Sequence, residues 1–94
     1  MKKIIILIPV FNDWESLKKL IVEINKNILN FREAHFECLI VNDASTIDQP
    51  KLTMPSNIKS VEILNMKENR GHARCNAFGI RHVFQKKDFD YLIL

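Results

Sequence analysis

The sequence predicts an α/β fold: a three-layer sandwich in which a mainly parallel sheet lies between helices. Its 94 residues suffice for one domain, and an apolar fraction of 47% suffices for a core. Four apolar runs show no alternation with polar residues, which is typical of strands buried on both faces. These runs alternate with amphipathic segments, and that order implies right-handed crossovers between parallel strands. We expect residues 1–94 to form a single domain.

The expected strands are short and rich in isoleucine, leucine and valine. They span residues 4–10, 36–41, 61–64 and 91–94. The first run follows two lysines as in a signal peptide, but it is too short to span a bilayer and contains Pro9. A buried first strand is the better interpretation.

Two helices are expected between these strands. The first spans residues 12–30: Asn12 and Glu15 have capping-box spacing, and a stripe follows that comprises Leu17, Leu20, Ile21, Ile24 and Ile28. The second spans residues 72–87, and its predicted apolar face comprises Ala73, Ala77, Ile80 and Phe84. Residues 45–57 form the longest loop, in which we expect a short helical turn at 48–52.

Charge and cysteine content exclude several classes of protein. The net charge is +3 and the 14 basic residues are scattered, whereas a nucleic-acid surface needs dense basic clusters with interleaved aromatic residues. We therefore expect no nucleic-acid partner. Cys38 and Cys75 fall in an expected strand and an expected helix, so they predict no disulfide framework and favour a reducing, intracellular setting.

Ligands of a parallel α/β sheet bind beyond the carboxyl ends of the strands, so the residues that follow each strand are the candidate site. They are Pro9, Val10 and Asn12, then Asp43 and Ser45, then Asn69, Gly71 and Arg74. Asp43 can accept hydrogen bonds from a nucleobase imide or a ribose hydroxyl. The alternative is a turn, because Asp and Ser side chains often bond their own backbone in loops.

The glycine pattern limits which cofactors are expected. No glycine precedes Gly71, which excludes a glycine-rich dinucleotide loop and a Walker phosphate loop. Arg70, Arg74 and the start of the second helix could face a diphosphate, and the alternative is that both arginines are solvated. A helix-interior glycine costs about 1 kcal/mol relative to alanine, so Gly79 predicts a close packing contact.

Metal and nucleophile chemistry are not expected from the histidines and cysteines. The spacing of His72, Cys75 and His82 matches no zinc signature. Cys75 has no identified third group that would orient a catalytic base. Trp14 is interpreted as a packing residue.

Four stretches together resemble a known family. IPVFND, VNDAST, NRGHARCNAFGI and DFDYLIL follow one another in the order and spacing of the inverting family 2 glycosyltransferases, which have a GT-A fold with a Rossmann-like sheet. The resemblance covers the whole chain. It implies that Pro9 and Val10 lie near the nucleoside, and that Asp43, the second acid of the family's Asp-Asp pair, contacts a uracil-like base. Asn42 and Ala44 replace the first acid and the usual glycine.

The third stretch carries the family's Asn-x-Gly at Asn69 and Gly71. Arg74 corresponds to the family's arginine near the phosphates, although Cys75 breaks the usual order of the motif. In the family the fourth strand leads into an Asp-x-Asp motif that binds Mg²⁺ or Mn²⁺. Asp88 and Asp90 precede the strand and are rejected as this motif, so we expect no metal-binding or catalytic residue in this chain.

The resemblance implies an enzyme that transfers a sugar from a UDP-, GDP- or dTDP-sugar to a saccharide or lipid acceptor. Such enzymes serve cell-wall or polysaccharide biosynthesis in the cytoplasm, often at the inner face of the membrane. We expect this chain to be the nucleotide-binding half, cut short of the metal motif and inactive alone. The alternative is a non-catalytic nucleotide-binding remnant or an interaction module. The oligomeric state is left open.

Overall fold

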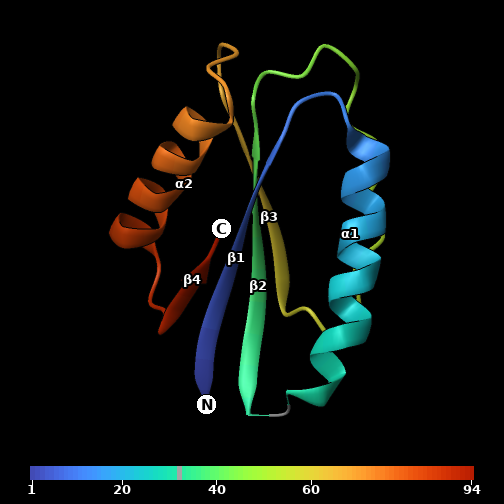
Figure 1. Cartoon of the computed structure of the whole chain (residues 1–94), viewed down its shortest axis with the longest axis vertical. Helices are drawn as coiled ribbons and strands as arrows, with labels where there is room; N and C mark the ends of the chain where they lie inside the picture. Colours follow the sequence, from blue (N-terminus) through green and yellow to red (C-terminus); the bar gives the residue numbers. More distant parts are fainter. Residues whose placement is uncertain (32) are drawn as a thin grey trace.

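The computed structural model describes residues 1–31 and 33–94 of the chain. It contains a four-stranded, all-parallel sheet of order β3-β2-β1-β4. Helices cover both faces, which confirms the α/β sandwich (Figure 1). The elements are β1 (Lys2–Val10), α1 (Trp14–Asn27), the 3₁₀ turn η1 (Ile28–Asn30), β2 (Ala34–Asn42), β3 (Ser60–Asn65), α2 (His72–Lys86) and β4 (Tyr91–Ile93).

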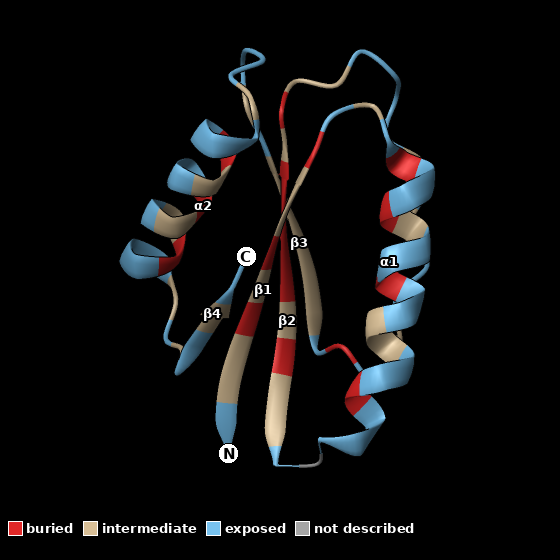
Figure 2. Ribbon diagram, viewed as in Figure 1, coloured by how far each residue is buried: buried red, intermediate tan, exposed pale blue. Residues whose placement is uncertain are grey.

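The core has two layers, one on each face of the sheet. Successive side chains of a strand point to opposite faces, so Ile5 and Leu7 of β1 pack toward α2, while Ile4, Ile6 and Ile8 pack toward α1. The buried residues of both helices face the strands between them (Figure 2). Burial on both faces explains why the strand sequences show no alternation.

Helix α1 begins one residue later than the capping-box spacing predicts. Asp13 caps it, because its carboxylate accepts a hydrogen bond from the Ser16 amide at 3.3 Å. The predicted cap at Asn12 is wrong, since Asn12 has a φ of +63° and turns its side chain to another loop. Trp14 is buried, as expected of a packing residue, whereas Leu20 of the predicted stripe is 44% exposed.

Helix α2 packs through a different face from the predicted one. Its buried residues are Cys75, Gly79 and Val83, and Ile80 is partly buried. Ala73 and Ala77 are exposed and Phe84 is 70% exposed, so the prediction for these three is wrong. Phe84 instead contacts the ring of Phe89 outside the core.

The packing of α2 explains its glycine. A Cβ atom at Gly79 would lie 2.5 Å from Cδ1 of Leu7 and 3.1 Å from Cγ2 of Val41. The helix therefore approaches the sheet more closely than a larger residue would allow, which confirms the close contact predicted for Gly79.

The segment between β2 and β3 contains no helical turn at residues 48–52, contrary to the prediction. It runs along α1 instead. Leu52 packs against the α1 layer of the core, and Asn57 hydrogen-bonds Asn25 through its backbone and side-chain nitrogens at 2.7 and 2.9 Å. These contacts with α1 satisfy polar groups that a local turn would otherwise pair.

Among the described residues, no helix combines the length and apolar character needed to cross a bilayer.

Candidate functional site

The carboxyl ends of the three long strands lie side by side at one edge of the sheet. Val10 pairs with Asn42, and Asn42 pairs with Asn65. The hydrogen bonding between neighbouring strands continues one residue further. The Asp43 amide donates to the Val10 carbonyl at 2.8 Å, and the Met66 amide donates to the Asn42 carbonyl at 2.9 Å. The loops that carry the candidate residues therefore start from the same edge.

Asp43 fastens the loop before α2 to the end of β2. The residue is 1% exposed, and its two carboxylate oxygens accept hydrogen bonds from the backbone amides of Arg70 at 2.7 Å and Gly71 at 2.8 Å. Both oxygens are thus engaged by the protein's own backbone. The acid predicted to contact a base has, in this structure, the role of holding the start of α2 in place.

The surroundings of Asp43 keep it ionised. Burial alone would raise its pKa, but the amides of Arg70 and Gly71, the thiol of Cys75 and the nearby charge of His72 together hold the pKa below the usual 3.8. In turn, burial and the Asp43 carboxylate raise the pKa of Cys75 to about 11. A thiol with that pKa stays protonated at neutral pH and is a poor nucleophile.

Asn12 joins the loop after β1 to the loop after β2. Its backbone amide donates to Oγ of Ser45 at 2.8 Å. Its side-chain Oδ1 accepts from the backbone amides of Thr46 at 2.7 Å and Ile47 at 2.9 Å. The structure therefore brings together Asn12 and Ser45, two of the predicted site residues. Because their polar groups bond each other, they shape the rim of the site.

Ala44 lies in the left-handed region with a φ of +56°, where the resemblance places a glycine. This conformation costs a residue with a Cβ roughly 1–2 kcal/mol. We expect Ala44→Gly to raise the free energy of unfolding by about 0.5–1 kcal/mol, since relief of that strain exceeds the greater flexibility of glycine in the unfolded chain. Urea denaturation followed by circular dichroism measures it. Ala73→Gly, at an exposed helical position, is the control and should lower stability.

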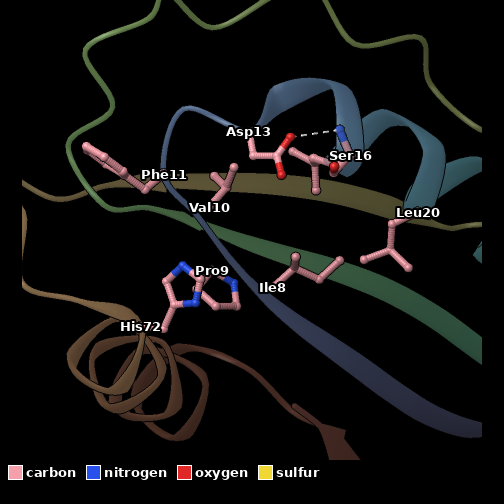
Figure 3. Close-up of a pocket in the computed structure, with 9 residues that line it drawn as sticks. Ile8, Pro9, Val10, Phe11, Asp13, Ser16, Leu20 and His72 are labelled. Atoms are coloured by element: carbon pink, nitrogen blue, oxygen red, sulfur yellow. Dashed lines mark hydrogen bonds between the residues drawn. The ribbon is translucent and has the colours of Figure 1, made fainter.

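A cavity of about 300 Å³ opens at the tip of β1, between α1 and the start of α2. Pro9 and Val10 line it, as do Leu20 and His72 (Figure 3). The hydrogen bond between Asp13 and Ser16 borders it. The other lining residues are Ile8, Phe11 and Leu17, so most of the wall is apolar. The exposed Leu20, which departs from the predicted stripe, is part of this wall.

His72 is a further candidate, which the sequence did not predict as part of a nucleotide site. It is the first residue of α2 and lines the cavity with Pro9. The sequence signal was its position directly after Gly71, whose φ of +86° ends the loop and starts the helix. A side chain at this position reaches the edge where the strands end.

Two predicted residues do not reach the cavity. Asn69 is exposed in the loop before α2 and is not part of the cavity wall. Arg74 lines a separate cavity with Arg70 and Arg81 on the outer side of α2. The structure thus gathers Pro9 and Val10 at the cavity, with loops shaped by Asn12, Asp43, Ser45 and Gly71, and leaves Asn69 and Arg74 apart.

Metal-binding groups do not converge in the described part of the chain. Across residues 1–31 and 33–94, no three His, Cys, Asp or Glu side chains come together in a way that could hold an ion. These residues therefore do not fit the Mg²⁺ or Mn²⁺ that the resemblance implies, and the chemistry of a metal is not assigned to them.

Comparison with protein families identifies the family of the chain. No curated protein and no solved structure matches the chain significantly. The family model described as Glycosyl transferase family 2 matches residues 5–94, which include all of the helices and strands named above except residues 2–4 of β1. By this match, the chain belongs to glycosyl transferase family 2.

Proposed function

We propose that this chain binds the nucleotide of a sugar donor, a UDP-, GDP- or dTDP-sugar, for an inverting glycosyltransferase. The observation that carries the proposal is the family match over residues 5–94 together with a cavity at the tip of β1. Parallel α/β sheets take their ligands at this edge. The proposal places the nucleoside in the cavity and the diphosphate toward the start of α2.

The cavity has the chemistry of a nucleoside site. Its volume of about 300 Å³ is at the lower end of the range for small-molecule pockets, which are mostly apolar with a few polar groups. Pro9, Val10 and Leu20 offer apolar surface to the flat faces of a base. His72 stands at the N-terminus of α2, where backbone amides and the helix dipole favour an anion.

In this proposal Asp43 is a positioning residue. It holds the amides of Arg70 and Gly71 and so fixes where α2 and His72 begin. Its removal should weaken nucleotide binding indirectly, because the start of the helix would lose its anchor.

We assign no catalytic residue to the chain. Inverting transfer needs a carboxylate that deprotonates the acceptor and a stabilised diphosphate leaving group, a task that a metal ion performs when bound. The contribution we propose for residues 1–94 is recognition of the donor. We further propose a saccharide or lipid acceptor and a role in cell-wall or polysaccharide biosynthesis in the cytoplasm, at the inner face of the membrane.

Titration calorimetry of the purified chain with UDP, GDP, CDP and dTDP, with and without Mn²⁺, tests the proposal. We expect saturable binding of UDP, GDP or dTDP with one site per chain. Heats no larger than those of a buffer blank for all four nucleotides would refute it.

His72→Ala is expected to weaken binding of the preferred nucleotide at least about tenfold, the effect of losing one hydrogen bond to a charged phosphate. The measurement is the same calorimetry. His82→Ala is the matched control, because His82 lies on the same helix but faces Glu62, with Nε2 at 3.5 Å from the carboxylate. Equal weakening by both substitutions would place the nucleotide elsewhere.

A further inference from the structure

The outer face of α2, away from the sheet, has an unusual composition. It comprises Arg74, Ala77, Phe78, Arg81 and Phe84, which recur at helical spacing on the side opposite the buried Cys75, Gly79 and Val83. Phe78 is 42% exposed and Phe84 is 70% exposed. Arg70 extends the face at the N-terminal end, where Arg70, Arg74, Arg81 and Phe78 line a cavity of about 390 Å³.

The positive charge of this face is not balanced. Helix α2 contains no Asp or Glu in its 15 residues. Among residues 1–31 and 33–94, Glu68 pairs with Arg70 at 2.9 Å, and no carboxylate lies within ion-pair distance of Arg74 or Arg81. Within the described part of the chain, the carboxylate contact of α2 itself is that of His82 with Glu62, which lies on β3, and it carries a positive charge only when His82 is protonated.

Helix α1 shows what an ordinary solvated face looks like in the same molecule. Its exposed side carries both signs of charge, with Glu15 paired to Lys18 at 3.5 Å and Glu23 paired to Lys26 at 3.7 Å. Mixed charge of this kind is typical of a surface that meets only water. The outer face of α2 differs because Arg74 and Arg81 have no paired acid among the described residues and the exposed rings of Phe78 and Phe84 accompany them.

We propose that the outer face of α2 binds the surface of an anionic lipid bilayer. Helices that lie in the membrane interface carry basic residues together with exposed aromatic residues, and their affinity depends on anionic lipid. Arg74 and Arg81 would meet lipid phosphates, and Phe78 and Phe84 would enter between the headgroups. Three arginines are too few for a nucleic-acid surface, where proteins typically neutralise more phosphates than this.

This arrangement has a geometrical consequence for the site. The nucleotide cavity lies at the N-terminus of α2, since His72 lines it. A helix lying along a bilayer would hold that cavity beside the membrane surface. The inference names a surface for the membrane location proposed above and rests on it in that respect, but it is argued from the charge and exposure of α2 and does not depend on nucleotide binding.

Co-sedimentation with vesicles tests it, with phosphatidylcholine alone or mixed with phosphatidylglycerol. We expect the purified chain to bind the mixed vesicles, to bind neutral vesicles weakly, and to dissociate from the mixed vesicles at high salt, because the attraction is electrostatic. Absence of binding to mixed vesicles would overturn the proposal. So would binding that neither lipid charge nor salt changes.

The Arg81→Glu substitution tests whether the outer face of α2 is the surface that binds the vesicles. Reversing one charge should weaken partition into mixed vesicles at least about tenfold, since each basic residue near an anionic bilayer contributes a several-fold factor. Lys19→Glu is the matched control, because it makes the same change of charge at an exposed position on α1. The logarithm of its partition coefficient should fall by less than half as much as that of Arg81→Glu. Equal losses would show that only net charge matters and would overturn the assignment to α2.

Two further measurements complete the test. Phe78→Ser, which leaves the charge unchanged, should also weaken vesicle binding, and no effect would exclude insertion of the aromatic ring. A single-stranded RNA homopolymer that binds more tightly than the vesicles at equal salt would assign the face to nucleic acid instead. Calorimetry with nucleotides on the wild-type chain reports separately on the proposed function.

Discussion

Replacement of Asp43 by asparagine is expected to lower the free energy of unfolding by about 3 kcal/mol. The carboxylate accepts one backbone amide on each oxygen and is 1% exposed. Asparagine keeps one acceptor but turns an NH₂ group toward the second amide, which leaves buried donors without partners. The substitution preserves volume, so the loss reports on hydrogen bonding and charge rather than on packing.

The stability that Asp43 contributes should fall as the pH is lowered. The pKa of Asp43 is lowered in the folded protein, so its contribution to stability is present above the unfolded-state pKa of about 3.9 and is lost as pH falls through the folded-state pKa. The stability difference between wild type and Asp43→Asn should therefore shrink below about pH 4. Urea denaturation at a series of pH values, followed by circular dichroism, measures it.

Asp48→Asn serves as the control for the change of charge. Asp48 is exposed in the segment between β2 and β3, and its substitution should alter stability by less than about 0.5 kcal/mol. A loss below about 1 kcal/mol for Asp43→Asn at neutral pH would mean that the two amide contacts contribute little to holding the loop.

Gly79→Ala is expected to destabilise the fold by about 2 kcal/mol, although alanine favours helix by about 1 kcal/mol. The added Cβ would lie 2.5 Å from Cδ1 of Leu7, and because Leu7 is 1% exposed its side chain can move only by displacing other core residues. Either the rotamer of Leu7 or the position of α2 must change. Thermal and urea denaturation measure the loss.

A double-mutant cycle identifies the contact that is responsible. In a Leu7→Ala background the clash with Leu7 disappears and only the 3.1 Å contact with Val41 remains, so Gly79→Ala should cost at least about 1 kcal/mol less there. Gln85→Ala, at an exposed position of the same helix, isolates helix propensity and should raise stability slightly. An equal loss from Gly79→Ala in both backgrounds would contradict the role given to Leu7.

The strands were predictable because local composition determines them. Continuous apolar runs occur where a strand is covered on both faces, and residues 4–10 lie within β1 as predicted. The face of α2 was not predictable in this way. Hydrophobic periodicity favours large residues such as Phe84, whereas the helix meets the sheet where Gly79 permits the closest approach. A glycine does not contribute to a hydrophobic pattern. The contact at Gly79 was therefore indicated only by the presence of a glycine within a helix, where it is unfavourable.

The candidate site was predictable as a location and less so in its details. The rule that ligands bind beyond the carboxyl ends of strands led to Pro9 and Val10, which do line the cavity. The partners of Asp43 depend on how a loop 27 residues away in sequence folds back onto β2, and no local pattern carries that information. The outward position of Arg74 follows from the rotation of α2, which the packing of Gly79 sets.

The central position of β1 bears on how the protein is made. Strand β1 leaves the ribosome before both of its partners: it pairs with β2 and also with β4, where Ile4 lies opposite Tyr91. Pairing between segments so distant in sequence slows folding and keeps partly assembled states exposed for longer. During translation β1 would therefore have one edge with unpaired backbone groups until residues 91–93 emerge. The pairing of β1 with β4 is thus the last strand pairing of this sheet that synthesis can complete.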